Sequence, residues 1–144
     1  MKKLFLSLCL FATITAFAKG PDPVTEKVKS SFKKEFPGAE LISWNDAGDY
    51  FKAVFLYGGY RTEAYFNEDG ELQGSARNIL YNQLPLAVTK SVEKRFTKPD
   101  VLEVSEITTE SGTRYLLRLE DGTKSYQVQY DGSGNNIGFE RVKK

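Results

Sequence analysis

The sequence predicts an α+β protein: a tandem repeat of two helix-plus-four-stranded antiparallel meander units, with each helix packed on one sheet face. Three observations lead to this prediction. Two short segments carry an apolar residue at every fourth position, as one face of a helix does. Eight other segments have the composition of half-buried strands and lie between short turns. The matching segments also recur at nearly constant offsets along the chain.

The predicted helices are identified by their boundaries and their apolar stripes. Asp22 and Pro23 suit an N-cap and a first helical position, and Pro37-Gly38 ends the first helix. Pro85 begins the second helix, and Pro99 follows its end. The stripes are Val24, Val28, Phe32 and Phe36 in the first helix, and Val88, Val92 and Phe96 in the second.

Four strand-like segments follow each helix. Gly58-Gly59 and Asp121-Gly122 suit two-residue hairpin turns, which need positive φ. Such short links make consecutive strands antiparallel neighbours. The predicted strands cover 39–45, 50–57, 60–67 and 71–79 after the first helix, and 101–108, 113–120, 124–130 and 136–142 after the second.

The offsets between the halves indicate duplication. The stripe of the first helix recurs sixty positions later, and Phe51 and Phe55 match Tyr115 and Leu119 at an offset of 64. We therefore expect repeats at 19–80 and 81–144, packed as one compact domain. Because Tyr81–Leu84 is the only candidate linker and is short, the halves should touch. Whether their sheets join stays open at this point.

The N-terminal segment resembles a secretory signal peptide. Lys2 and Lys3 precede an uncharged apolar run over 4–17, and Ala16-Phe17-Ala18 is a small-residue cleavage pattern. An uncleaved anchor is the alternative, but the run is shorter than the roughly 20 residues that span a bilayer. We expect a signal peptide at 1–18, and a periplasmic or extracellular product without stable membrane insertion.

Composition excludes several classes of function. The chain has no histidine, and its one cysteine, Cys9, lies in the predicted leader. The mature chain thus lacks His-based catalysis, a Cys nucleophile, a disulfide and an ordinary zinc site. The 20 basic and 19 acidic residues of the full chain nearly balance, so charge gives no reason to expect nucleic-acid binding.

Catalytic and metal motifs are also missing from the sequence. Ser75 lies outside any nucleophile motif, and no Walker loop is present. Asp131 to Asn135 alternates oxygen ligands like a calcium loop but lacks its glycine and its final glutamate, so we expect a plain turn. We predict no enzyme, cofactor or metal site; a paired-carboxylate hydrolase would need a clustered, buried carboxylate pair.

One sheet face of the first half is the candidate binding surface. Residues two apart in a strand share a face, and the helix should cover the face of Phe51 and Phe55. The corresponding opposite face in the second half is mostly polar, whereas in the first half it is rich in apolar and aromatic side chains. Cover by the other half or by a second copy is the alternative interpretation. The candidate partner-binding residues are Tyr50, Lys52, Val54, Leu56, Arg61 and Tyr65.

The motifs together resemble the PepSY-like family of exported bacterial proteins, also described as beta-lactamase-inhibitor-like. The resemblance rests on F-P-G-A at 36–39, Trp44, Y-F-K-A-V-F at 50–55 and A-Y-F-N-E-D-G-E-L at 64–72, and it extends over residues 22–142. It implies tandem helix-plus-sheet repeats and a non-catalytic binding role, such as inhibition of a secreted enzyme. The missing cysteines depart from the inhibitor's disulfide pattern, so a beta-lactamase target is not expected.

Two functional hypotheses follow. The first is an exported, non-enzymatic binding protein whose partner is a protein of the cell envelope. The second is a periplasmic carrier or sensor of a small apolar or sugar ligand held on the same face. A flat or concave open sheet favours the first hypothesis, and an enclosed pocket between helix and sheet favours the second.

Overall fold

The structure is a computed structural model that describes residues 23–142. The predicted signal peptide and Asp22 lie outside the described residues. The helices are α1 (Glu26–Glu35) and α2 (Leu86–Arg95), with a 3₁₀ turn, η1 (Tyr81–Gln83), before α2. The strands are β1 (Glu40–Asp46), β2 (Phe51–Tyr57), β3 (Tyr60–Phe66), β4 (Leu72–Asn78), β5 (Asp100–Thr109), β6 (Gly112–Asp121), β7 (Lys124–Asp131) and β8 (Asn136–Val142).

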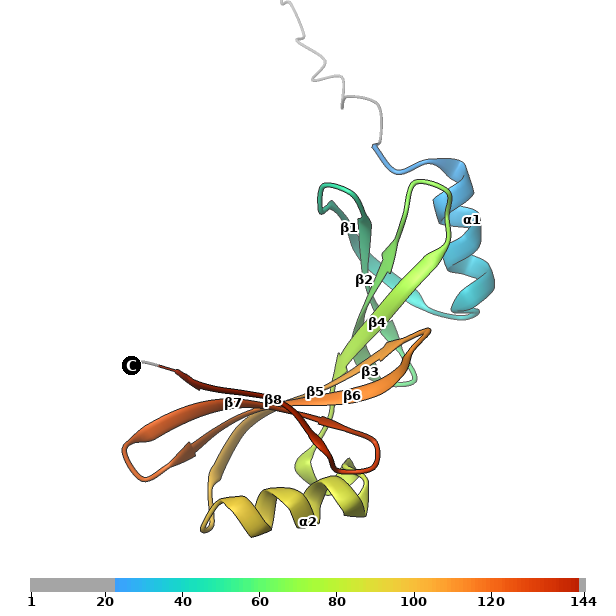
Figure 1. The fold of residues 1–144 in the computed structure, drawn as a ribbon. Coiled ribbons are helices and arrows are strands. Elements are labelled where there is room, and N and C mark those ends of the chain that lie inside the picture. The colour runs from blue at the N-terminus through green and yellow to red at the C-terminus, as the bar shows by residue number, and fades with distance from the viewer. Residues whose placement is uncertain (1–22, 143–144) are drawn as a thin grey trace, which may run out of the picture.

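All eight strands form one antiparallel sheet in the order β1-β2-β3-β4-β5-β6-β7-β8. The predicted tandem arrangement of two four-stranded units is therefore wrong. The strands lie within a few residues of their predicted positions, but a single meander runs through the whole described chain (Figure 1). The error lies in strand pairing, because sequence periodicity locates strands without showing which of them are neighbours.

The pairing of β4 with β5 joins the two halves. Gly74 to Asn78 lie opposite Thr109 to Ser105 in antiparallel register. Side chains also cross this junction: Arg77 Nε donates to Glu106 Oε1 at 2.8 Å, and Ser105 Oγ donates to Asn78 Oδ1 at 3.0 Å. The 79–99 segment carries η1 and α2 before the chain returns, so the last strand of one half and the first of the other become neighbours.

Both helices pack on the same face of the sheet. The register places Ala53, Ala64, Ser75, Thr108 and Thr113 in one row across β2 to β6. The row begins on the face under α1, and Thr113 shares a face with the β6 residues under α2. The opposite face is left without a helix along the whole sheet.

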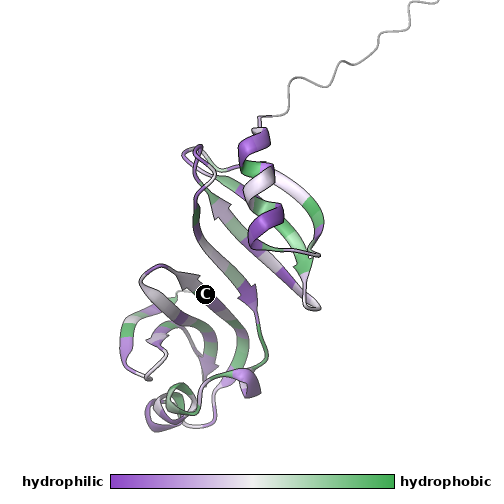
Figure 2. Cartoon of the chain, turned by 90° about the vertical axis from the view of Figure 1, so that its right-hand side faces the viewer, coloured by the Kyte–Doolittle hydropathy of each residue, from purple (hydrophilic) through white to green (hydrophobic). Residues whose placement is uncertain are grey.

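Each helix covers its own hydrophobic core. The α1 core is continued by ring contacts, with the Phe32 ring 4.9 Å from Phe55 and 5.5 Å from Trp44 between centroids. In Figure 2, strand segments beside α1 are coloured hydrophobic. The α1 core contains Val24, Val28, Phe32, Ala53, Phe55, Ala64 and Phe66. The α2 core contains Leu84, Val88, Val92, Phe96, Val104, Tyr115, Leu117, Leu119, Val128 and Tyr130.

The start of α1 differs from the sequence prediction. Thr25, not Asp22, is the N-cap, and its Oγ1 accepts a hydrogen bond from the Val28 amide at 3.2 Å. A threonine hydroxyl satisfies one of the otherwise unpaired amides of the first turn. Pro85 lies at the N-cap of α2.

Truncating either stripe phenylalanine should destabilise the protein strongly. Phe32 and Phe96 are each 5% exposed and lie in different cores. Phe32→Ala and Phe96→Ala should each lower the free energy of unfolding by about 3–5 kcal/mol, because each leaves a cavity. Equilibrium denaturation measures the loss. Losses well under ~1 kcal/mol in both variants would contradict these core assignments.

The loops that leave the two helices differ at one strained position. After α1, Gly38 has φ 80°, and after α2, Lys98 has φ 52°. Lys98 is the only non-glycine residue with positive φ in 23–142. A lysine in the left-handed region suffers a steric clash that glycine avoids.

Lys98→Gly should therefore raise the free energy of unfolding by about 0.5–1 kcal/mol, the relief of strain being partly offset by the greater freedom of the unfolded chain. Gly38→Lys is the matched reverse change and should lower stability by ~1 kcal/mol. Thermal and urea unfolding of both variants measure the two effects. A destabilised Lys98→Gly variant would contradict strain at this position.

Candidate binding surface on the open sheet face

The predicted site residues share the sheet face that carries no helix. The register pairs Lys52 with Tyr65 and Leu56 with Arg61 across β2 and β3. Val54 lies between these pairs on β2 and opposite Glu63. Tyr50 directly precedes β2 with the same parity. The six predicted residues therefore lie on one continuous surface, which we call the open face.

The predicted residues differ in how far they are exposed to solvent: some form the surface, and others lie beneath it. Tyr50 is 43% exposed and Leu56 is 41% exposed, so the other half of the chain does not cover this face. Val54 is only 3% exposed and lies beneath its neighbours. It can support the surface but cannot contribute much contact area of its own.

A small polar network lies beside these apolar residues. The Tyr65 hydroxyl donates to Glu63 Oε2 at 3.1 Å, and Lys52 Nζ lies 3.7 Å from the same oxygen. Burial, followed by the neighbouring Glu63 carboxylate, raises the pKa of Tyr65 above its usual 10.0. These contacts hold the Tyr65 ring in place. The sequence analysis did not select Glu63, although its parity places it on the same face.

An apolar groove of about 350 Å³ crosses the middle of the open face. Its walls come from both halves: Tyr50 and Tyr65 on one side, Ile107 and Thr109 on the other. The second wall was not predicted, because the pairing of β4 with β5 cannot be read from local sequence patterns. The lining residues are Tyr50, Tyr65, Gln73, Gly74, Ser75, Ala76, Ile107 and Thr109.

Small residues on β4 keep the groove hollow. Gly74 lies opposite Tyr65 on one side and Thr109 on the other. A Cβ at Gly74 would lie 3.0 Å from the Thr108 carbonyl oxygen and 3.1 Å from Thr109 Cγ2, which is tighter than ordinary contact. Glycine therefore allows β5 to approach closely and leaves the floor of the groove without a side chain.

A polar hollow of about 290 Å³ adjoins the apolar groove, and Ala76 lines both. Here Asn78 Nδ2 donates to Glu103 Oε1 at 3.2 Å, and Arg118 Nη1 lies 3.2 Å from Glu103 Oε2. The hollow is lined by Arg61, Glu63, Ala76, Arg77, Asn78, Glu103 and Ser105. The open face thus offers an apolar groove next to groups of both charges.

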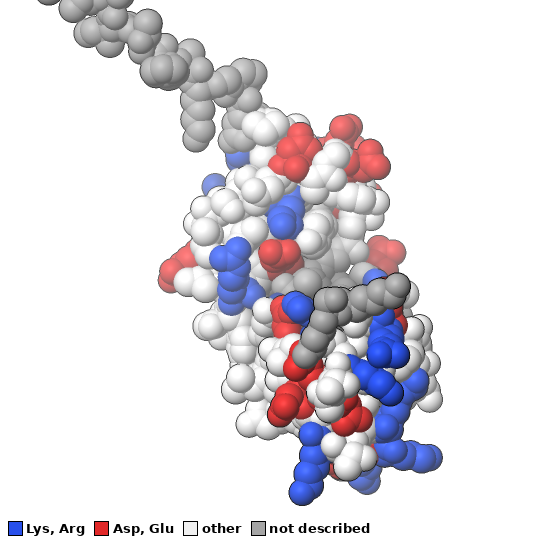
Figure 3. Space-filling view, turned by 90° about the vertical axis from the view of Figure 1, so that its left-hand side faces the viewer, with Lys and Arg blue, Asp and Glu red and all other residues white. Residues whose placement is uncertain are grey.

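The sheet is bent, and the open face lies on the inner side of the bend. In Figure 1, α1 and α2 lie on the outer side of the two halves. One extra residue in each of β1, β4, β5 and β8 interrupts the regular ladder and permits this curvature. Figure 3 shows both acidic and basic side chains on this side of the molecule, with acidic ones grouped at the upper end and basic ones along the lower right.

The described residues show no arrangement typical of a hydrolase or metal site. Thr62 is the only buried polar residue in 23–142, so no carboxylate there is buried. No group of three or more metal-ligating side chains occurs in the same range. The 131–135 loop is a turn, as predicted: Asp131 Oδ1 accepts from the amides of Ser133 and Asn135, both at 2.9 Å. The side-chain amide of Asn135, which donates to Asp131 Oδ2 at 2.8 Å, lowers the pKa of Asp131 most, and the backbone amides lower it further.

Comparison with solved structures shows the fold. A BLIP-like protein from Bacteroides fragilis superimposes with a TM-score of 0.77 at 22% identity, covering 87% of this chain and 91% of its own. A DUF2874 family protein from Bacteroides uniformis gives 0.76 at 19% identity, covering 82% and 89%. A candidate periplasmic protein from Bacteroides eggerthii gives 0.76 at 19%, covering 84% and 91%.

The chain therefore has the fold of the BLIP-like and DUF2874 proteins. No family model matches the sequence, and no curated protein matches it closely. Within residues 23–142, neither helix has the length and apolar character needed to cross a bilayer.

Alkaline pH should lower stability through buried phenols. Burial raises the pKa of Tyr65, Tyr81, Tyr115 and Tyr130 above 10.0. The native state then holds these protons more tightly than the unfolded chain, so this contribution is fully present below pH ~10 and is lost at higher pH. Urea unfolding between pH 9 and 11 measures how steeply the free energy of unfolding falls as the pH rises. Tyr65→Phe should reduce it; Tyr50→Phe, which alters a more exposed ring, is the control. Equal slopes in wild type and Tyr65→Phe would contradict the assignment for Tyr65.

Proposed function

We propose that this chain is an exported, non-enzymatic binding protein of the PepSY-like type that holds a protein of the cell envelope against its open face. The observation that carries the proposal is the apolar groove in the middle of an uncovered, concave sheet. Both halves contribute to it, and groups of both charges surround it. Uncovered apolar area on a folded protein is a common mark of a contact site.

Export and family membership are supported by three independent observations. The first 18 residues have the pattern of a signal peptide. One protein of the same fold is a candidate periplasmic protein, and another is BLIP-like. The motifs at 36–39 and 64–72 resemble those of PepSY-like proteins. A fold alone does not define function, so the role is argued from the open face.

The groove suits a protein partner that inserts one side chain into it. Its tyrosines are among the residue types enriched at interfaces, where an aromatic or aliphatic side chain of the partner fills a central pocket. The charged groups around Arg61 and Glu103 would then lie at the rim and select orientation. A loop with one large apolar side chain between charged residues fits this arrangement.

The proposal can be tested by using this protein as bait to capture its partner from the cell-envelope fraction. The bait is the mature chain, compared with a Tyr65→Gln, Leu56→Glu double variant that makes the open face polar. The second substitution is at Leu56 and not at Val54, because Val54 is buried and a charged side chain there would disturb packing. The control is Leu86→Gln, which removes a 68% exposed leucine from α2 on the outer side.

The double variant should lose at least tenfold in affinity while its free energy of unfolding stays within ~1 kcal/mol of wild type. The Leu86→Gln variant should bind as wild type does. A folded double variant that binds its partner normally would contradict the proposed surface. Unfolding of the double variant would instead show that Tyr65 and Leu56 support the fold.

A small apolar or sugar ligand in the same groove is the alternative. The volume of about 350 Å³ lies within the size range of small-molecule sites. Native mass spectrometry of chain purified from the envelope distinguishes the two functions: a retained small molecule supports the carrier, and a co-purifying protein supports the binding protein.

A further inference from the structure

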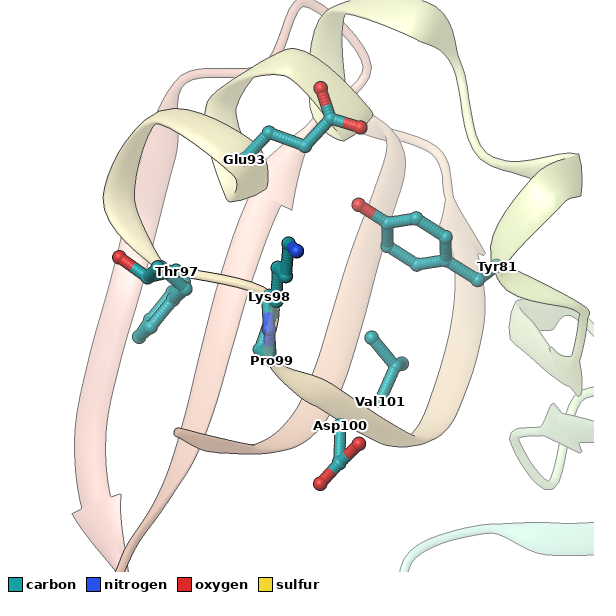
Figure 4. A pocket seen from close by; sticks show the side chains of 8 residues that line it. Tyr81, Glu93, Thr97, Lys98, Pro99, Asp100 and Val101 are labelled. Atoms are coloured by element: carbon teal, nitrogen blue, oxygen red, sulfur yellow. The ribbon is translucent and has the colours of Figure 1, made fainter. Parts of the chain in front are cut away.

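A second cavity lies on the outer, helix-bearing side of the sheet. It has a volume of about 700 Å³, opens to solvent and is bounded by η1, the C-terminal end of α2 and the beginning of β5 (Figure 4). It shares no lining residue with the groove or hollow of the open face. Its lining residues are Tyr81, Glu93, Phe96, Thr97, Lys98, Pro99, Asp100 and Val101.

Three polar groups from three separate segments converge on this cavity. In Figure 4, the Tyr81 hydroxyl and the end of the Lys98 side chain lie beside the same space, the Glu93 carboxylate lies above it, and Asp100 points away from it. Glu93 and Lys98 are both exposed to solvent. Among the described residues, neither Glu93 nor Lys98 forms an ion pair within 4.0 Å. Burial and then the Glu93 carboxylate raise the pKa of Tyr81, which therefore remains a neutral hydrogen-bond donor near neutral pH.

The backbone at Lys98 is strained, and the strain directs its side chain. Lys98 has φ 52°, where the loop after α1 has Gly38 at φ 80°. A non-glycine residue in this region persists only where the surroundings hold it, and such residues cluster at ligand sites. The Pro99 ring further restricts the residue before it. Lys98 thus lines the cavity from a strained backbone position.

The walls of the cavity are mainly apolar. Tyr81 contributes its ring, and Phe96, Pro99 and Val101 contribute hydrocarbon. Tyr81 and Val101 also pack against the α2 core, which fixes their positions. Small-ligand sites usually combine such apolar walls with a few convergent polar groups in a volume of roughly 300–1,000 Å³.

We propose that this cavity binds a small zwitterion with an apolar side chain, of the class of free α-amino acids. The ligand's ammonium would lie against Glu93, its carboxylate would receive Lys98 and the Tyr81 hydroxyl, and its side chain would rest on Phe96 and Val101. One ligand of this class can pair with both side chains at once, whereas a simple anion or cation could pair with only one of them. The site is separate from the proposed protein-binding surface and adds a small-molecule function to it.

The test uses the intact mature chain and three related probes. L-Leucine carries both charges, N-acetyl-L-leucine lacks the ammonium, and L-leucinamide lacks the carboxylate. Backbone amide chemical shifts followed by NMR titration should show saturable leucine binding, with shifts confined to residues around η1, the end of α2 and the start of β5. Each single-charge probe should bind at least tenfold more weakly.

Side-chain variants assign the contacts. Glu93→Gln and Lys98→Met should each weaken leucine binding at least tenfold, because each removes one charge while keeping the shape of the residue. The control is Lys90→Met, an exposed α2 lysine that does not line the cavity. It should bind leucine as wild type does.

Three results would overturn the proposal: no saturable leucine shifts at up to tens of millimolar, equal binding of all three probes, or unchanged binding in both charge variants. If a variant fails to fold, the three probes with the wild-type chain still decide. Because the open face shares no residue with this cavity, envelope capture and leucine binding can each fail while the other succeeds.

Discussion

The backbone pairing of β4 with β5 is the interaction on which the rest of this structure depends. It converts two helix-covered sheets into one sheet of eight strands. Without this pairing, β4 and β5 would each present an edge with unpaired amide and carbonyl groups, which invites association with other chains. The pairing satisfies these groups, and the Arg77–Glu106 contact at 2.8 Å secures the register from the helix-bearing side. It also places residues from both halves side by side on the open face.

The placement of both helices on one side of the sheet decides where a binding surface can exist. Burial of apolar area beneath α1 and α2 provides the main stabilisation, and each helix is short enough to cover only its own half. The opposite side receives no helix, so its composition is free to serve contact instead of stability. On this side the exposed Tyr50 and Leu56 lie beside the buried Val54.

Two kinds of residue shape the cavities of this molecule. Small residues on β4, Gly74 and Ala76, leave the floor of the open face low enough for a groove and a polar hollow. On the other side, Lys98 stands where the corresponding loop after α1 has glycine, and it adds a basic side chain to the lining of the outer cavity. The small β4 residues remove side-chain volume from a regular strand, whereas Lys98 introduces backbone strain in a loop.

The sequence by itself determined the elements and their buried faces. Spacing of four identified the stripes of Phe32 and Phe96, and turn pairs such as Gly58-Gly59 marked the hairpins, because these signals are local. Parity also placed Lys52, Leu56 and Tyr65 on one face. Only the tertiary structure decided that β4 pairs with β5, that Ile107 completes the groove and that Val54 is buried. Each of these depends on contacts between residues far apart in the chain, for which a single sequence carries no period or spacing.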